Sequence, residues 1–258
     1  MNGTKVILIS IDGMRPDGLL ACGNPYVEEL RSMAYYTLNG QTVLPPVTLP
    51  CHMSLFHSVP PERHGIITNT YVPMVRPLDG LFEVLKKDHA VNAFYYGWEP
   101  IREVARPGSL KFAEYIQAYT EEHSDVALTD RALARIAESK PDFVFLYMVE
   151  TDEKGGHDNG WMTEAYLERI RLAIDNVRRV VEQCREEYII IITADHGGHD
   201  RMHGCDIPED TTIPTFYIGP QFKKGTQFFE GSILDIAPTI AKLMGVEAPP
   251  EWEGASVI

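Results

Sequence analysis

The sequence has no long hydrophobic run. Its longest strongly apolar stretches, Val6 to Ile11 and Tyr188 to Ile192, fall far short of the roughly 18 residues that a membrane-spanning helix needs. The first stretch follows a single lysine and ends at Asp12 without a small-residue cleavage site, so we interpret it as a core strand and not as a signal peptide. We therefore expect no membrane partner.

Cysteine is scarce and widely spaced. The four cysteines form no CxxC pair, and a chain of 258 residues can build a core without disulfide bonds. The simplest interpretation is reduced thiols in the cytoplasm.

Positively charged residues are also few. The chain has 23 Lys and Arg against 37 Asp and Glu, a formal net charge of −14, and its basic residues occur only in short clusters. Such a surface repels phosphate backbones, so nucleic acid is not expected as a bulk partner. Some of the carboxylates, with the nine histidines, are instead candidate ligands for cations.

Short apolar runs alternate with helical patterns along the whole chain. The runs are typical of strands buried on both faces of a parallel sheet, and they lie at Lys5–Ile11, Val91–Tyr96, Asp142–Val149, Tyr188–Thr193 and Thr215–Ile218. Apolar residues at helical spacing, with possible caps at Thr163 and Ser232, predict helices over Leu81–Lys87, Leu128–Ser139, Glu164–Glu186 and Leu234–Leu243. This order predicts an α/β fold, a three-layer αβα sandwich with a central, mostly parallel sheet. No linker interrupts it, so we expect residues 1–258 to form one domain.

Acidic residues and histidines follow three of these strands. Asp12 comes directly after the first strand, Asp152 soon after the third, and Asp195 with His196 after the fourth. Each alone could be an ordinary turn residue, and a lone His157 could be an exposed loop histidine. Because ligands of such sheets bind at the carboxyl ends of strands, their convergence favours a site.

The residue types in this set suit divalent metal ions. Zn²⁺ takes mixed imidazole and carboxylate ligands. Six candidates are Asp12, Asp152, His157, Asp195, His196 and His203. Thr48 supplies a candidate nucleophile, because Pro45 and Pro46 prevent an earlier helix and Pro50 is allowed in a first turn, which puts the hydroxyl at a helix N-terminus. The alternative is that Thr48 is only an N-cap.

The order of these motifs resembles the alkaline phosphatase superfamily, specifically its type I phosphodiesterase/nucleotide pyrophosphatase family. The shared segments are ISIDGMRPD, TLPCH with PERHGIITN, YMVETDEKGGH, TADHGGH, HGCDIPED and IPTFYIGP. The sulfatase branch fits poorly, because its modified Cys or Ser nucleophile is out of register with Cys51.

The resemblance implies two metal sites and a role for each residue. One ion, most simply Zn²⁺, would be bound by Asp12, Thr48, Asp195 and His196, and the second by Asp152, His157 and His203. Asn69 would be catalytic as a donor to a phosphoryl oxygen, Tyr147 would stack on a nucleobase, and His199 is a candidate contact to the substrate or to a metal ligand.

The implied activity is hydrolysis of a small phosphorylated substrate, most simply a phosphodiester. Thr48 would attack phosphorus between two cations and form a phosphothreonine intermediate. A neutral amide at Asn69 suits a diester, although Arg76, Arg102 or Arg201 could also reach the site. Phosphonoacetate hydrolysis, phosphomonoester hydrolysis and a silent metal- or phosphate-binding protein remain alternatives.

Two departures from the family pattern bear on the substrate. His157 lies five residues after Asp152 where the family usually has four. His203 comes only seven positions after His196, where nucleotide pyrophosphatases have a long insertion. The role of Tyr147 depends on this missing insertion. The oligomeric state is not encoded in any motif.

Overall fold

An eight-stranded sheet forms the centre of the molecule in the computed structural model, which describes residues 3–106 and 108–258. Its strands are β1 (Val6–Ile11), β2 (Tyr35–Gln41), β3 (Asn92–Tyr96), β4 (Phe112–Tyr115), β5 (Phe143–Met148), β6 (Ile189–Thr193), β7 (Thr212–Ile218) and β8 (Thr226–Gln227). Their order across the sheet is β4-β3-β5-β1-β6-β7-β2-β8. Within the described residues only β7 runs antiparallel to its neighbours, so the prediction of a mostly parallel sheet is confirmed.

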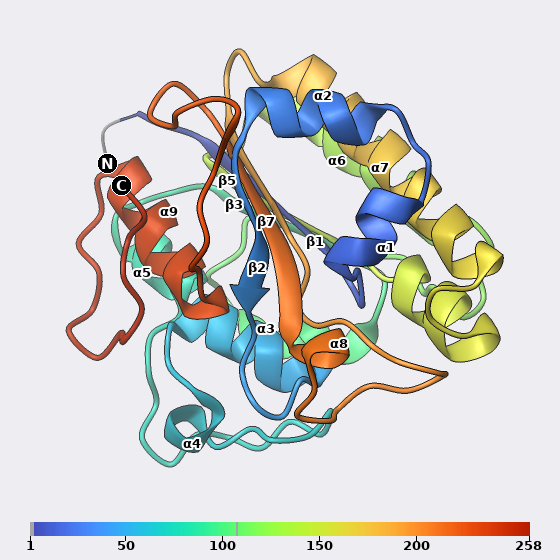
Figure 1. Cartoon of the computed structure of the whole chain (residues 1–258). Coiled ribbons are helices and arrows are strands. Elements are labelled where there is room, and N and C mark those ends of the chain that lie inside the picture. The colour runs from blue at the N-terminus through green and yellow to red at the C-terminus, as the bar shows by residue number, and fades with distance from the viewer. Residues whose placement is uncertain (1–2, 107) are drawn as a thin grey trace.

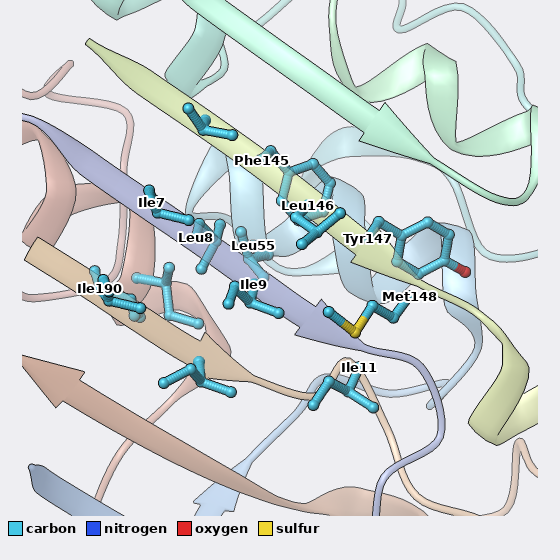
Figure 2. Packing of buried hydrophobic residues seen from close by; sticks show 14 of the residues in the cluster. Ile7, Leu8, Ile9, Ile11, Leu55, Phe145, Leu146, Tyr147, Met148 and Ile190 are labelled. Atoms are coloured by element: carbon cyan, nitrogen blue, oxygen red, sulfur yellow. The ribbon is translucent and has the colours of Figure 1, made fainter. Parts of the chain in front are cut away.

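The central strands are hydrophobic because both of their faces are covered. β1 lies between β5 and β6, with Ile9 in register with Leu146 on one side and Ile192 on the other, and all six β1 residues are buried. Figure 2 shows the side chains of β1 beside those of β5, with Leu55 reaching the cluster from a helix. Each such aliphatic side chain contributes about 1.5–3 kcal/mol by leaving water, so these strands are the most firmly fixed part of the fold.

Helices cover the two faces of the sheet as separate groups (Figure 1). The first group, whose members contact α7, comprises α1 (Pro16–Ala21), α2 (Tyr26–Met33), α6 (Ser124–Ser139) and α7 (Glu164–Cys184). The second comprises α3 (Thr48–His57), α5 (Leu81–Lys87) and α9 (Ile236–Met244). Shorter elements are α4 (Pro61–His64), α8 (Pro208–Thr211), the 3₁₀ helices η1 (Glu99–Val104) and η3 (Ile233–Asp235), and the π-helix η2 (Thr151–His157). The predicted three-layer αβα sandwich is thus confirmed.

The caps expected from the sequence are formed. The Thr163 side chain accepts a hydrogen bond from the Tyr166 backbone N–H at the start of α7, and the Ser232 hydroxyl accepts one from Leu234. No helix within the described residues has both the length and the apolar character to cross a bilayer.

Candidate metal centre

Three neighbouring strands carry the predicted ligands to one edge of the sheet. Asp12 follows β1 directly, Asp152 lies in η2 just beyond β5, and Asp195 follows β6 after one residue. Gly13 is required at this edge, because its φ is +66° and a Cβ there would lie 2.8 Å from Oδ1 of Asp152. The close approach brings the chain from β1 against the carboxylate that follows β5.

The first group of ligands is buried. Asp12, Asp195 and His196 offer donor atoms that all lie within 4.8 Å of one another. Nε2 of His196 is 3.3 Å from Oδ1 of Asp12 and 3.4 Å from Oδ2 of Asp195. We call this set the buried group.

The second group is partly open to solvent. It consists of Asp152, His157 and His203, whose donor atoms also lie within 4.8 Å of one another. Nε2 of His157 is 3.4 Å from Oδ2 of Asp152, and Nε2 of His203 is 3.9 Å from its Oδ1. The side chain of His157 is 36% exposed, so we call this set the rim group.

The π-helix explains the five-residue spacing in the rim group. A π-turn accommodates one residue more than an α-turn. Asp152 and His157 therefore face the same point although they are five residues apart. The extra residue noted in the sequence is absorbed by the helix type and does not displace the ligand.

Each of the three histidines has its Nδ1 held by a backbone carbonyl, with its Nε2 beside a carboxylate of its own group. Nδ1 lies 2.8 Å from the Gly197 carbonyl in His196, 3.0 Å from the Arg201 carbonyl in His157 and 2.9 Å from the Pro46 carbonyl in His203. A carbonyl can only accept, so each Nδ1 carries the proton and each Nε2 presents a lone pair. This is the usual arrangement of metal-binding imidazoles, whose second nitrogen is held by the protein.

The carboxylates also have atoms without a partner. Oδ1 of Asp12, Oδ1 of Asp152 and Oδ2 of Asp195 are buried and accept no hydrogen bond within the described residues. Buried carboxylate oxygens without partners are strongly unfavourable unless a cation or proton binds them. The donor set and its orphaned oxygens therefore fit divalent metal ions.

Electrostatics lead to the same conclusion. Burial, followed by the charge of Asp195, raises the pKa of Asp12 and of Asp152 well above the usual value. Burial opposes the ionisation of Asp195 as well, but the adjacent imidazoles of His196 and His52 lower its pKa. Without cations the ionisation of all three carboxylates together is therefore unfavourable, as is typical of carboxylates that bind a cation.

The candidate nucleophile lies at the start of α3, against the buried group. Thr48 is the first residue of α3, and its Oγ1 is 3.1 Å from Nε2 of His196. Val47 takes the N-cap position, and no side chain caps the helix by a hydrogen bond. Thr48 is therefore not an N-cap, which removes the alternative interpretation of this residue.

Asn69 lies beside Thr48 with its amide oriented by the helix. Its Oδ1 accepts a hydrogen bond from the Leu49 backbone N–H at 3.0 Å. The carbonyl side of the amide is thereby occupied, and the NH₂ group remains for another acceptor.

A small cavity lies between the two groups and the nucleophile. Its volume is about 80 Å³. It is lined by Asp12, Thr48, Asn69, Trp98, Tyr119, Val149, Asp152, Glu153, His157 and His203. Among the described residues no lysine or arginine lines it, so Arg76, Arg102 and Arg201 do not contribute to its wall. Arg102 pairs with Glu99 and Glu103 instead.

Four lining residues were not predicted as site residues: Trp98, Tyr119, Val149 and Glu153. Trp98 comes just after β3, so the strand-end rule that indicated the carboxylates would also have indicated it. Tyr119 follows β4, which has no continuous apolar run, and Glu153 is adjacent to Asp152.

Tyr147 requires a correction. It was expected to stack on a nucleobase, but its side chain is fully buried within β5 and its hydroxyl donates a hydrogen bond to Oδ2 of Asp12. Because strand residues alternate between faces and this one points into the core beside His52, its ring cannot reach a ligand. Tyr147 instead orients a candidate metal ligand.

His199 does not line the cavity either. Its Nδ1 lies 2.7 Å from Oδ1 of the fully buried Asp210. The expected substrate contact is thus absent from this arrangement, and the ring belongs to a separate cluster.

Comparison with solved structures defines the class of the fold. Murine ectonucleotide pyrophosphatase/phosphodiesterase 5 superposes with a TM-score of 0.83 at 14% identity, over 98% of each chain, and an inactive variant of it, with one threonine replaced by alanine, was solved in complex with AMP. The phosphonate monoester hydrolase from Silicibacter pomeroyi gives a TM-score of 0.78 at 16% identity, over 98% of this chain and 76% of that one. The fold is therefore alkaline phosphatase-like.

Comparison of sequences identifies the family. The chain matches the family model of type I phosphodiesterase/nucleotide pyrophosphatase over residues 6–207. It is 26% identical to human ectonucleotide pyrophosphatase/phosphodiesterase family member 1 over 217 residues. The match covers 74% of this chain and 23% of that protein. The chain spans about a quarter of the length of the curated relatives it matches. It belongs to the type I phosphodiesterase/nucleotide pyrophosphatase family.

Proposed function

We propose that this protein is a two-metal hydrolase of phosphodiesters that acts through Thr48. The observation that carries the proposal is the convergence of three unpartnered carboxylate oxygens and three imidazole Nε2 atoms beside the Thr48 hydroxyl. Membership of the family supports the reaction class.

The buried group and the rim group would each hold one divalent ion, most simply Zn²⁺. Such ions lower the pKa of a bound hydroxyl and stabilise negative charge on the attacking and leaving oxygens. The likeness to a relative that is inactive when a threonine is replaced by alanine supports a threonine nucleophile.

Thr48 would form the covalent intermediate. Its Oγ1 bonds to phosphorus as the bond to the leaving-group oxygen breaks, and that oxygen departs with the electron pair. Water then hydrolyses the phosphothreonine and restores the hydroxyl. The Asn69 amide, oriented by Leu49, would donate to a non-bridging phosphoryl oxygen throughout.

The charge of the cavity wall favours a diester over a monoester. The wall carries the carboxylates of Asp12, Asp152 and Glu153, and its neutral amide donor is Asn69, with no lysine or arginine among the lining residues. These carboxylates would neutralise most of the charge of two bound dications, so the cavity would have little net positive charge. A singly charged phosphodiester is therefore accommodated better than a doubly charged monoester.

The size of the cavity separates the phosphoryl group from the rest of the substrate. About 80 Å³ admits little more than the phosphoryl group. Trp98 and the 55% exposed Tyr119 form the aromatic part of the wall, so the ester groups would lie outward against these rings. The complex of a structural neighbour with AMP supports a flat ring there, and a nucleotide or aryl phosphodiester is the proposed substrate type.

A substrate panel with matched variants tests the function. We expect the Zn²⁺-loaded protein to hydrolyse bis(p-nitrophenyl) phosphate faster than p-nitrophenyl phosphate, phosphonoacetate and an aryl sulfate. Thr48→Ala should lower the diesterase rate by roughly a thousandfold or more while the Zn²⁺ content is kept, and Thr48→Ser should retain part of the rate. A faster rate with phosphonoacetate, or wild-type turnover in Thr48→Ala, would contradict the proposal. No turnover of any substrate would favour a binding protein.

We also propose a reducing compartment such as the cytoplasm. All four cysteines are free thiols, and three of them are buried. Mass spectrometry of thiol-labelled protein taken from its native cells tests this, because a disulfide in that protein would contradict it.

A further inference from the structure

A third cluster of ligand-type side chains lies outside the catalytic cavity. His199, Cys205 and Asp210 offer donor atoms that all lie within 4.8 Å of one another, and none of the three lines the cavity or belongs to the buried or rim group. We infer that these three residues bind a further divalent cation of the Zn²⁺ type, which cross-links the loop that carries His203.

The geometry of the cluster is preorganised around Asp210. This carboxylate is fully buried; its Oδ2 accepts a hydrogen bond from the Cys205 backbone N–H at 2.8 Å, and its Oδ1 lies 2.7 Å from Nδ1 of His199. The Asp210 carbonyl also accepts a hydrogen bond from the Gly197 N–H. Both ends of the loop are therefore fixed relative to the carboxylate before any ion binds.

The chemistry of the donors selects a cation of this kind. A thiolate and a carboxylate together carry two negative charges, which one dication neutralises, and the imidazole is a neutral third ligand. Sulfur, nitrogen and oxygen donors in a set of three, with water in the fourth position, suit tetrahedral Zn²⁺ and disfavour Mg²⁺ or Ca²⁺. The ion would take the place of the hydrogen bond between His199 and Asp210, and the Cys205 thiol would release its proton when it binds the metal.

The loop is only partly covered by the rest of the protein. Residues 199 to 206 are all at least partly exposed, and Met202 is 50% exposed. His203, which lies between His199 and Cys205 in the chain, is held by its hydrogen bond to the Pro46 carbonyl and by stacking on His196. A metal cross-link between His199 and Cys205 would add a further constraint on this ligand of the rim group.

Cobalt spectroscopy tests the site, because Cys205 is the one thiol in the three ligand groups. The metal-free enzyme is loaded with Co²⁺, and a sulfur-to-cobalt charge-transfer band is expected in the near ultraviolet. Cys205→Ser should lose the band, and the matched control Cys184→Ser, in a buried α7 thiol, should keep it. Elemental analysis of the Zn²⁺ form should give three ions per chain in the wild type and two in Cys205→Ser. A wild-type spectrum without the band, or an unchanged band in Cys205→Ser, means an ion pair only and overturns the inference.

Thiol protection provides a second measurement if Cys205→Ser does not fold. Cys205 is partly exposed and the other three cysteines are buried, so a thiol reagent should modify one thiol of the native enzyme quickly. We expect Zn²⁺ to slow this reaction at least tenfold in the wild type but not in His199→Gln, which keeps both catalytic groups. Equal rates with and without Zn²⁺ in the wild type would overturn the inference.

The inference and the proposed function fail separately. Diesterase activity with two ions and no thiolate band would leave the proposed function intact. A thiolate band in an enzyme whose buried and rim groups bind no metal would leave only the third site.

Discussion

The two ligand groups beside Thr48 differ in how the fold holds them. The buried group projects from the ends of β1 and β6, and its side chains are at most 2% exposed. The rim group comes from a π-helix and a loop, and His157 in it is 36% exposed. The strands impose the geometry of the first group, whereas the second depends on local devices such as the π-turn. We therefore expect the buried group to tie metal binding to the stability of the whole core, and the rim group to exchange its metal with little effect on the fold.

The largest expected difference comes from removing one ligand of each group. Asp195→Asn should lower diesterase activity by roughly a thousandfold or more and lower the melting temperature of the Zn²⁺-loaded protein, because a buried metal loses its charge partner. His157→Gln should lower Zn²⁺ affinity at one site by at least roughly a hundredfold, with an unchanged fold. Elemental analysis, kinetics and thermal unfolding check both variants. Loss of both metals in His157→Gln would show that the groups are one unit and not two.

The difference between the two groups also corresponds to which strands could be predicted from the sequence. The strands that carry the buried group are continuous apolar runs, so β1, β5 and β6 are predicted to within two residues at each end. β2 has a mixed burial pattern and β4 an alternating half-exposed one, and neither contains a continuous run of this kind. Both are missed for that reason.

The residues of the candidate site divide in the same way. Aspartates and histidines at strand ends are visible as motifs, whereas the cavity wall depends on which loops fold over it. Trp98 and Tyr119 reach the cavity from loops beyond β3 and β4, on the far side of β5 from β1. Tyr147 is buried together with every other residue of β5, and its spacing from Asp152, on which the stacking role was based, carries no information about burial.

We expect pH to have a smaller effect, which acts on protein stability through the buried and rim groups together. The raised pKa values of Asp12 and Asp152 mean that the metal-free native state retains protons that the unfolded chain releases, so their contribution to stability is present below the usual aspartate pKa and is lost as the pH rises. The lowered pKa of Asp195 changes the stability in the opposite direction, but it is a single group, whereas two groups have a raised pKa. Bound metal removes the penalty of ionising Asp12 and Asp152.

The stabilisation by Zn²⁺ should therefore grow as the pH rises above the usual aspartate pKa of about 4. Each kcal/mol of the increase raises the melting temperature by roughly 2–4 °C for a chain of this size. His203 does not reverse the trend, since burial and the neighbouring His196 lower its pKa to about 3 and keep its imidazole neutral. Thermal unfolding with Zn²⁺ and with a chelator at each pH checks the result. A Zn²⁺ increment that is independent of pH would show that the carboxylates are not coupled to the metal.

The smallest expected effect is that of Tyr147→Phe, which tests how the buried group is oriented. The change removes the hydroxyl that donates to Asp12, and a hydrogen bond to a charged group contributes about 1.5–3 kcal/mol. In the Zn²⁺-loaded protein Asp12 would still be held by the metal, so we expect kcat to fall by no more than roughly tenfold. The KM for a nucleotide diester should not change, because the Tyr147 ring is buried and does not line the cavity. Tyr119→Ala is the matched control, since it removes a lining ring and should raise KM without loss of metal. A raised KM in Tyr147→Phe with kcat unchanged would instead place Tyr147 in contact with the substrate.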